Sequence, residues 1–287
     1  MRTLTQRDFI SSLVEVGLRS GDVVLVQCDL LRIGPLAGIS DREGILDFYY
    51  SGLREVLTEQ GTLVVVTAFE DYARYNTPFV LEESPSRTGV FSEHIRCMPQ
   101  ALRSCHPIMS LTALGPMAEE ICGGAHIDGL GYDSPWGRLH RMNAKLLTLG
   151  YGFQKDGMTF LHYVENLLSV PYQYNKIYNT PVIAYGKKMP GPFTMSVRYL
   201  DYGILNNQER FKRHLVKVDA AVRMPLGRGF LYFTSCAKVV YLAMECYRQD
   251  PYFLLEEPPR FRPGEIPMDG LTGEMKTVYD KGVDHAD

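Results

Sequence analysis

The sequence DVVLVQ at residues 22–27 and the sequence TLVVVTAF at residues 62–69 decide the fold class. Both are runs of β-branched and apolar residues without alternation, which is typical of strands buried on both faces of a sheet. Segment 45–57, between them, carries apolar residues at a spacing near 3.6 and is expected to be a helix. A strand, a helix and a second buried strand in this order indicate an α/β fold.

The alternation of helical and strand patterns continues through the first half of the chain. Apolar residues at helical spacing predict helices at 5–16, 89–98, 116–123 and 159–168, and apolar runs predict strands at 110–114 and 145–149. Segment 70–88 is polar, contains two prolines and has no period. We therefore expect a long surface loop there.

Beyond residue 171 the sequence changes character. Segments 181–185, 193–199 and 229–233 are rich in Val, Tyr and Phe and lie between turn signals, which indicates antiparallel strands, and helical patterns remain at 211–216 and 237–248. We expect a single α/β domain over 1–287, with a central mixed, largely parallel sheet flanked by helices and a strand-rich C-terminal half. Its parts are 1–170, 171–260 and an extended C-terminal arm at 261–287.

The composition indicates which kinds of partner and compartment to expect. Hydrophobic residues make up 45% of the chain and the formal net charge is −3, with no block of Lys or Arg, so nucleic acid is not expected as a partner. Six cysteines form no CxxC pair, which favours a reduced, cytoplasmic protein. The sequence has no signal-peptide pattern and no apolar stretch of about 18 residues, so we expect no membrane span.

His162 and Glu165 form the strongest chemical pattern. They lie three residues apart on the helix predicted at 159–168, so they share one face, and Thr159 lies in the first turn. The helix follows a predicted strand, and ligands bind at the carboxyl ends of such strands. A carboxylate beside an imidazole fixes its tautomer, as a general base requires. The alternative is a helix whose polar face is simply solvated.

Other chemistries have weaker support. Cys105 and His106 suggest a thiol nucleophile, but neighbours in an extended segment point to opposite faces. His162 has no second His at i+4 and no cysteine cluster to complete a zinc site, so no metal is expected. Trp136 lies on a segment that either covers a ligand or packs on the core.

Two turns resemble anion-binding turns without matching a known phosphate motif. Gly34 and Gly38 follow the first strand and precede a helix, which is the usual place for a phosphate-binding turn. Segment 86–89 (SRTG) also precedes a predicted helix, where backbone N–H groups and Arg87 could hold an anion. A helix cap formed by Ser86 is the alternative.

Taken in order, these segments resemble the aminoglycoside 3-N-acetyltransferase family, whose members move an acetyl group from acetyl-coenzyme A onto an amine of an aminoglycoside antibiotic. The resemblance covers about residues 5–170 in good order and extends more loosely to about 250. It is carried by the motifs at 21–26 (GDVVLV), 33–35 (IGP), 61–65 (GTLVV), 86–94 (SRTGVFSEH), 103–107 (RSCHP), 134–139 (SPWGRL) and 156–165 (DGMTFLHYVE).

The resemblance implies an N-acyltransferase in which His162 is the general base, assisted by Glu165 and Thr159, and in which the amine attacks the thioester directly in a ternary complex. By this resemblance, residues 1–170 form the core that binds coenzyme and carries the catalytic residues, and residues 171–260 form the side that binds the acceptor. The residues implied for the coenzyme are Asp29, Leu30, Arg32, Gly34, Ser86, Arg87 and Gly89. One departure is that the family's Ser-Leu-Arg becomes Asp29-Leu30-Leu31-Arg32, which leaves open an acyl group other than acetyl.

The acceptor is expected to be a small amino sugar, and the amine is expected to meet carboxylates. Asp156, Glu70 and Asp71 are the candidates, with Glu82 and Glu83 further along. The modest net charge also suits an acceptor with a phosphate, such as a nucleotide-linked amino sugar, because basic residues recur in the second half: Lys187, Lys188, Arg210, Lys212 and Arg213. A non-catalytic coenzyme A-binding relative is a further alternative, and a homo-oligomer is compatible with the sequence.

Overall fold

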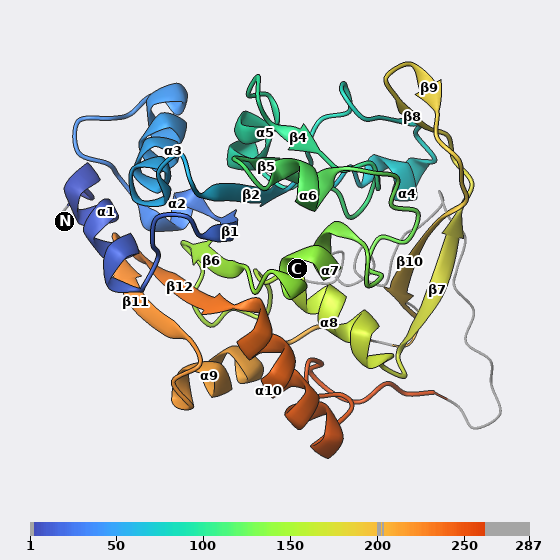
Figure 1. Ribbon diagram of the computed structural model, residues 1–287. Coiled ribbons are helices and arrows are strands. Elements are labelled where there is room, and N and C mark those ends of the chain that lie inside the picture. The colour runs from blue at the N-terminus through green and yellow to red at the C-terminus, as the bar shows by residue number, and fades with distance from the viewer. Residues whose placement is uncertain (1–2, 200–201, 203, 262–287) are drawn as a thin grey trace, which may run out of the picture.

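A seven-stranded mixed sheet forms the centre of the molecule (Figure 1). The computed structural model describes residues 3–199, 202 and 204–261, so nearly all of the arm expected at 261–287 lies outside the described residues. The strand order is β11-β12-β6-β1-β2-β5-β4. At the centre, β1 (Val23–Cys28) runs parallel to β2 (Thr62–Val66) on one side and to β6 (Lys145–Leu149) on the other.

The strands outside this centre are antiparallel to their neighbours. On one side β5 (Leu111–Leu114) pairs with β2 and with β4 (Leu102–Arg103), and on the other β12 (Gly229–Ser235) pairs with β6 and with β11 (Val222–Leu226). The expected mixed α/β sheet is confirmed, with its parallel pairings confined to β2-β1-β6.

The central strands are buried on both faces, as their unbroken apolar sequences predict. Leu25 and Val64 belong to one hydrophobic core, whereas Val24 and Val65, next to them in sequence, belong to the other. Successive side chains of a strand point to opposite faces, so continuous apolar runs supply both cores at once. The result is a three-layer arrangement of helices, sheet and helices.

Each face of the sheet has its own set of helices (Figure 1). One core packs beneath α1 (Gln6–Glu15), α3 (Arg42–Leu57), α5 (Val90–Arg96) and the short α2 (Leu30–Ile33). The other lies beneath α6 (Ala118–Cys122), α7 (Pro135–Arg141), α8 (Phe160–Leu168), α9 (Glu209–Lys217) and α10 (Cys236–Gln249). None of the helices in the described ranges is long and apolar enough to cross a bilayer.

Two small sheets stand beside the central one (Figure 1, right). One pairs β7 (Gln173–Tyr178) with β10 (Phe193–Arg198), and the other holds β3 (Phe79–Val80), β8 (Val182–Ala184) and β9 (Lys187–Lys188). The strands expected at 181–185 and 193–199 are confirmed as β8 and β10, and the strand expected at 229–233 joins the central sheet as β12. Strand β7 was not predicted, because its sequence QYNKIY is largely polar.

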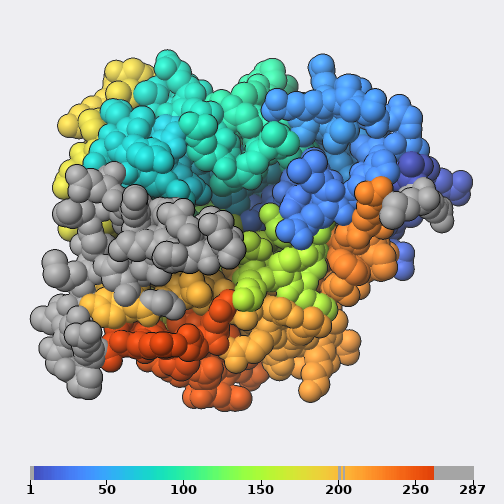
Figure 2. Space-filling model, turned by 180° about the vertical axis from the view of Figure 1, so that it is seen from behind, coloured from blue at the N-terminus to red at the C-terminus, as the bar shows by residue number. Residues whose placement is uncertain are grey.

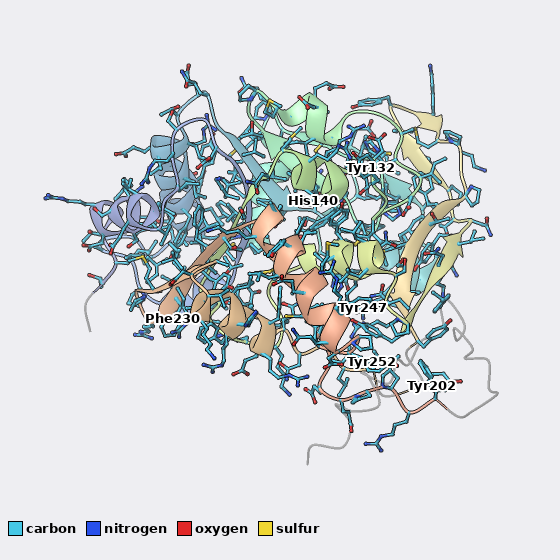
Figure 3. The ribbon with its side chains drawn as sticks, turned by 60° about the horizontal axis from the view of Figure 1, so that its bottom comes forward. Tyr132, His140, Tyr202, Phe230, Tyr247 and Tyr252 are labelled. Atoms are coloured by element: carbon cyan, nitrogen blue, oxygen red, sulfur yellow. The ribbon has the colours of Figure 1, made fainter. Side chains whose placement is uncertain are left out.

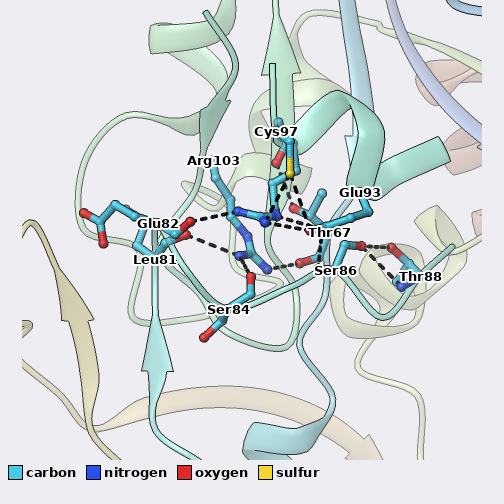
Figure 4. Close-up of polar contacts among 11 residues, drawn as sticks. Thr67, Leu81, Glu82, Ser84, Ser86, Thr88, Glu93, Cys97 and Arg103 are labelled. Carbon is cyan, nitrogen blue, oxygen red and sulfur yellow. Dashed lines mark hydrogen bonds and ion pairs between the residues drawn. The ribbon is translucent and has the colours of Figure 1, made fainter. Parts of the chain in front are cut away.

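Segment 70–88 is not the surface loop that its polarity predicts. It contains α4 (Asp71–Tyr75) and β3, and the side chains of Tyr72 and Phe79 are fully buried in a third hydrophobic cluster. Arg103 anchors the end of the segment by donating to the carbonyls of Leu81 and Ser84, and to that of Thr67 (Figure 4). A buried guanidinium thus supplies order that the local sequence does not encode.

Candidate active site

The first turn of α8 is fixed to the central strand of the sheet. The side-chain amide of Gln27, at the end of β1, accepts from Thr159 N at 2.8 Å and donates to Thr159 Oγ1 at 2.6 Å. Gln208 accepts from Met158 N at 3.0 Å and holds the loop before the helix. The helix that carries His162 therefore begins at a defined point beside the carboxyl end of β1.

His162 is paired with a buried carboxylate. Its Nδ1 lies 3.0 Å from Oε2 of Glu165, whose side chain is only 2% exposed, against 32% for the imidazole. An ionised carboxylate only accepts hydrogen bonds, so Nδ1 carries the proton and Nε2 keeps its lone pair. The alternative of a simply solvated polar face is wrong for Glu165, which lies inside the protein.

Tyr172 completes this arrangement. Its hydroxyl donates to Oε1 of Glu165 at 2.9 Å, and its side chain is fully buried. Burial, and then the neighbouring Glu165 charge, raise the pKa of the Tyr172 phenol, so the hydroxyl stays a donor. Its ring packs against that of Tyr252, beyond the end of α10 (Figure 3), with 6.1 Å between centroids. Each oxygen of the buried carboxylate thus has one donor.

Thr159 and His162 lie where two cavities adjoin. The larger, of about 500 Å³, is bounded by β7, β10, α4 and the apolar residues Ile108 and Met109. The smaller, of about 430 Å³, is bounded by the Lys155–Asp156 loop and by Gln208. Arg198 also lines both. A base placed between two cavities can meet two reactants, one from each side.

The expected carboxylates are divided between the cavities. Asp156 lines the smaller one, and its backbone carbonyl accepts from Lys212 Nζ at 2.5 Å. Glu70 lines the larger one, where it pairs with Arg74 at 3.1 Å. Asp71 lines neither cavity and is paired with the guanidinium of Arg87 at 2.6 Å.

The two segments expected to hold coenzyme lie at the carboxyl ends of the neighbouring parallel strands β1 and β2. Asp29 begins α2, pairs with Arg32 at 2.7 Å and donates its N–H to the carbonyl of Leu149 at the end of β6. Gly150 follows with φ 85°, and a Cβ there would lie 2.1 Å from the Asp29 carbonyl oxygen, so only glycine fits. Figure 2 shows the surface of the loop after β6, in yellow-green, bordered by this blue segment and by orange segments of the second half.

The second segment meets the larger cavity through one residue. Thr88 lines it and donates to the carbonyl of Val66, the last residue of β2. Ser86 shares a hydrogen bond with Thr88, and its backbone N–H donates to Glu93 at 2.7 Å. The described linings of the two cavities do not include Asp29, Leu30, Arg32, Gly34, Ser86, Arg87 or Gly89.

The other residues that the sequence offered as candidates for chemistry have structural roles. Burial raises the pKa of the Cys105 thiol. His106 is fully buried, and its Nδ1 accepts from Met109 N at 3.1 Å while Nε2 donates to the carbonyl of Thr194. Trp136 packs in the core on α7 and donates to the carbonyl of Met109. Within the described ranges, no group of three or more His, Cys, Asp or Glu is placed to hold a metal ion.

Several residues around His162 were not predicted from the sequence: Gln27, Tyr172, Arg74, Lys176 and Arg198. Tyr172 reaches Glu165 because Ser169 takes a left-handed conformation (φ 50°) and reverses the chain after α8. The Pro171 turn signals that reversal but not the contact. The five basic residues predicted for a phosphate lie outside both described linings: Lys187 and Lys188 on exposed β9, and Arg210, Lys212 and Arg213 on α9.

The fold and the site define an α/β protein in which an imidazole, oriented by a buried carboxylate, stands between two cavities at the edge of a mixed sheet. A family model described as aminoglycoside 3-N-acetyltransferase matches residues 25–248. The chain belongs to the aminoglycoside 3-N-acetyltransferase family, which confirms the resemblance and makes its enzyme class that of the N-acetyltransferases.

Individual relatives agree with this assignment. Aminoglycoside N(3)-acetyltransferase III of Salmonella sp is 27% identical over 259 residues, covering 81% of this chain and 85% of that protein. Aminoglycoside N(3)-acetyltransferase VII of Streptomyces paromomycinus is 30% identical over 207 residues, which cover 66% of this chain and 68% of that protein.

Solved structures share the fold. AAC-IIIb in its binary complex with CoASH superposes with a TM-score of 0.72 at 21% identity, covering 86% of this chain and 98% of that one. AAC-VIa bound to sisomicin superposes with a TM-score of 0.73 at 22% identity, covering 86% of this chain and 98% of that one.

Proposed function

We propose that the protein transfers an acetyl group from acetyl-coenzyme A directly to the amine of an amino sugar, with His162 as the general base. One observation carries the proposal: Glu165 holds the Nδ1 proton of His162 at 3.0 Å from inside the protein, while the imidazole lines both cavities. Nε2 is thereby left as a proton acceptor at the place where two reactants meet.

The chemistry follows from the groups present. The coenzyme supplies an activated thioester, and the acceptor amine attacks in its neutral form, which arises when the ammonium ion has released one proton to water. His162 Nε2 takes the proton that the amine nitrogen releases when it bonds to the carbonyl carbon. The imidazolium that forms is stabilised by the Glu165 carboxylate. His162 then returns the proton as the carbon–sulfur bond breaks and the thiol leaves.

Thr159 is suited to stabilise the carbonyl oxygen. Gln27 donates to Thr159 Oγ1 at 2.6 Å, so that oxygen already accepts one hydrogen bond and its own proton is directed elsewhere. Since Thr159 lines both cavities beside His162, its hydroxyl is placed to donate to the negative charge that develops on the thioester oxygen.

Direct transfer, without an acyl-enzyme, is the proposed route. The described linings of the two cavities contain no cysteine, and burial raises the pKa of the Cys105 thiol, which disfavours the nucleophilic thiolate. The amine is itself a good nucleophile once deprotonated, so a single base meets the requirement of the reaction.

The ligand assignments extend this proposal. We assign Asp29, Leu30, Arg32, Gly34, Ser86, Arg87 and Gly89 to the coenzyme on the resemblance of their motifs, and the CoASH complex of AAC-IIIb supports coenzyme A as the carrier of the acyl group. Asp156 and Glu70 are assigned to the amine from opposite cavities, and Asp71 acts through its ion pair with Arg87. The alternative of a non-catalytic coenzyme A-binding relative is disfavoured by the intact pair of His162 with the buried Glu165.

Substitution of His162 by alanine tests the proposal. We expect His162→Ala to lower thiol release from acetyl-coenzyme A with an amine acceptor by at least 100-fold, since general-base catalysis typically contributes roughly 10²–10⁴-fold. Calorimetry should still detect coenzyme A binding. His214→Ala, on α9 and outside both cavities, is the matched control and should keep full activity. Retained activity in His162→Ala would contradict the mechanism.

A further inference from the structure

Helix α9 and the residue before it hold the loop that leads into α8. Gln208, which precedes α9, donates its backbone N–H to the carbonyl of Lys155 at 2.9 Å. Its side-chain amide accepts from Met158 N at 3.0 Å and donates to Met158 O at 3.3 Å. Lys212, one turn further along the same face, donates from Nζ to the carbonyl of Asp156 at 2.5 Å. The backbone of this loop is therefore fixed by groups from the second half of the chain.

Both side chains that hold the loop lie inside the protein. Gln208 is 4% exposed and Lys212 is 2% exposed. Phe211 and Leu215, between and beyond them on α9, are buried in the core on the same side of the sheet as α8. The hydroxyl of Tyr232, on β12, donates to the carbonyl of Lys212 at 3.2 Å. Helix α9 is thus attached to the central sheet and gives the loop a fixed support.

The buried charge of Lys212 needs a reason beyond the filling of space. Taking an ammonium group out of water costs free energy, and a methionine of similar length would fill the volume without that cost. Burial lowers the pKa of Lys212 to about 8, although the neighbouring charges of Asp156 and Glu209 act to raise it. The group is therefore mainly protonated at neutral pH and gives the Asp156 carbonyl a charge-assisted hydrogen bond.

The loop held in this way forms part of the smaller cavity and sets the start of α8. Asp156 lines that cavity, and so does Gln208. Thr159 follows Met158 directly and precedes the first residue of α8. Gln27 binds the N–H and Oγ1 of Thr159 from the β1 side. The first turn of α8 is thus held by one glutamine from the sheet and by another from α9.

We propose that Lys212 and Gln208 are positioning residues of this enzyme: Lys212 sets the place of Asp156 in the smaller cavity, and Gln208 sets the first turn of α8. The inference rests on the proposed function, in which Asp156 meets the acceptor amine and Thr159 and His162 act on the transfer. Both residues act through the backbone of the loop. Such support matters for rate, because a misplacement of about 1 Å in a reacting geometry can cost roughly 100-fold.

Replacement of Lys212 by methionine tests the first contact. Thiol release from acetyl-coenzyme A is measured with kanamycin, glucosamine and a uridine diphosphate-linked amino sugar as acceptors. For the acceptor that the wild type uses best, Lys212→Met should raise KM about tenfold or more, because Asp156 is no longer held, and the KM for acetyl-coenzyme A should stay within about twofold. Lys217→Met, at an exposed lysine in the last turn of the same helix, is the matched control and should change neither KM. An unchanged acceptor KM in Lys212→Met, with folding verified by urea denaturation, would overturn the role of Lys212.

A double-variant cycle separates positioning from a merely structural role. If Lys212 acts through Asp156, the pair Asp156→Asn and Lys212→Met should raise the acceptor KM no further than about twofold beyond Asp156→Asn alone. Effects that multiply in the double variant would show that Lys212 acts independently of Asp156, and its assignment would be wrong. An unchanged acceptor KM in Asp156→Asn alone would have the same consequence.

Gln208→Met tests the second contact and decides the matter if Lys212→Met does not fold. It removes both bonds to Met158 and keeps the backbone bond to Lys155. We expect kcat to fall about tenfold or more, because the turn that carries Thr159 loses one of its two supports. Gln249→Met, at the exposed end of α10, is the matched control and should keep kcat.

The outcomes for the two levels of the account differ. A wild-type enzyme that turns over an amine, with kcat within about twofold in Gln208→Met and an unchanged acceptor KM in Lys212→Met, would overturn this inference and leave the proposed function intact. A wild-type protein that acetylates none of the three acceptors would overturn the proposed function, and this inference with it.

Discussion

Replacement of Glu165 by glutamine probes the site most sharply, because it removes the charge and turns one of the two acceptor oxygens into a donor. The glutamine side chain has the same size, and its oxygen can still accept from either His162 or Tyr172. The carboxylate it replaces lies 3.0 Å from Nδ1 and is almost completely buried. A hydrogen bond to a charged group is worth about 1.5–3 kcal/mol. Loss of that amount from the imidazolium in the transition state predicts that kcat falls about 10- to 150-fold.

The stability of the protein should respond differently. The dehydration cost of the buried carboxylate disappears with its charge, but one buried hydrogen bond is lost, so the free energy of unfolding should fall by no more than about 3 kcal/mol. The assay pairs steady-state thiol release with urea denaturation of the same preparation. A kcat within twofold of wild type, in a background where His162→Ala is inactive, would refute the claim that Glu165 supports the base.

Three further predictions concern the surroundings of the site. Tyr172→Phe leaves one oxygen of Glu165 buried without a donor, so urea denaturation should show a loss of about 1–3 kcal/mol, together with a lower kcat. Arg103→Met removes the donor to three carbonyls and should lower the free energy of unfolding by about 2–4 kcal/mol, while an unchanged denaturation midpoint would refute its anchoring role. Burial lowers the pKa of His106 from 6.5 to about 4. The unfolded chain therefore binds a proton that the folded chain does not, and up to about 3 kcal/mol of stability should be lost as the pH falls from 6.5 to 4. His106→Asn should flatten that dependence, and an equally steep slope in the variant would show that another group causes it.

The elements that the sequence predicts well are those whose pattern is local. Strands β1, β2 and β6 are buried on both faces, and their unbroken apolar runs require it. His162 and Glu165 share a helix face because they are three residues apart, which needs no tertiary information. The same reasoning located the site at the end of β6, directly after a predicted strand.

What the sequence could not supply depends on contacts between distant segments. Gln27 meets Thr159 across 132 residues, and no spacing rule connects them. Segment 70–88 is locally polar, yet the buried Tyr72 ring and the Arg103 anchor give it a helix and a strand. Lys176 was missed because strand β7 lacks an apolar pattern. Arg198 lies on β10, which was predicted, but its place in the cavity depends on the pairing of β10 with β7.

A structure of the enzyme with coenzyme A and a non-reacting amine acceptor would show whether His162 lies between the two reactants as the general base. We expect the amine nitrogen within hydrogen-bond reach of His162 Nε2, about 2.6–3.2 Å, and the coenzyme sulfur on the other side of that nitrogen at the junction of the two cavities. A coenzyme sulfur outside both cavities, or an amine whose nearest basic group is not His162, would contradict it.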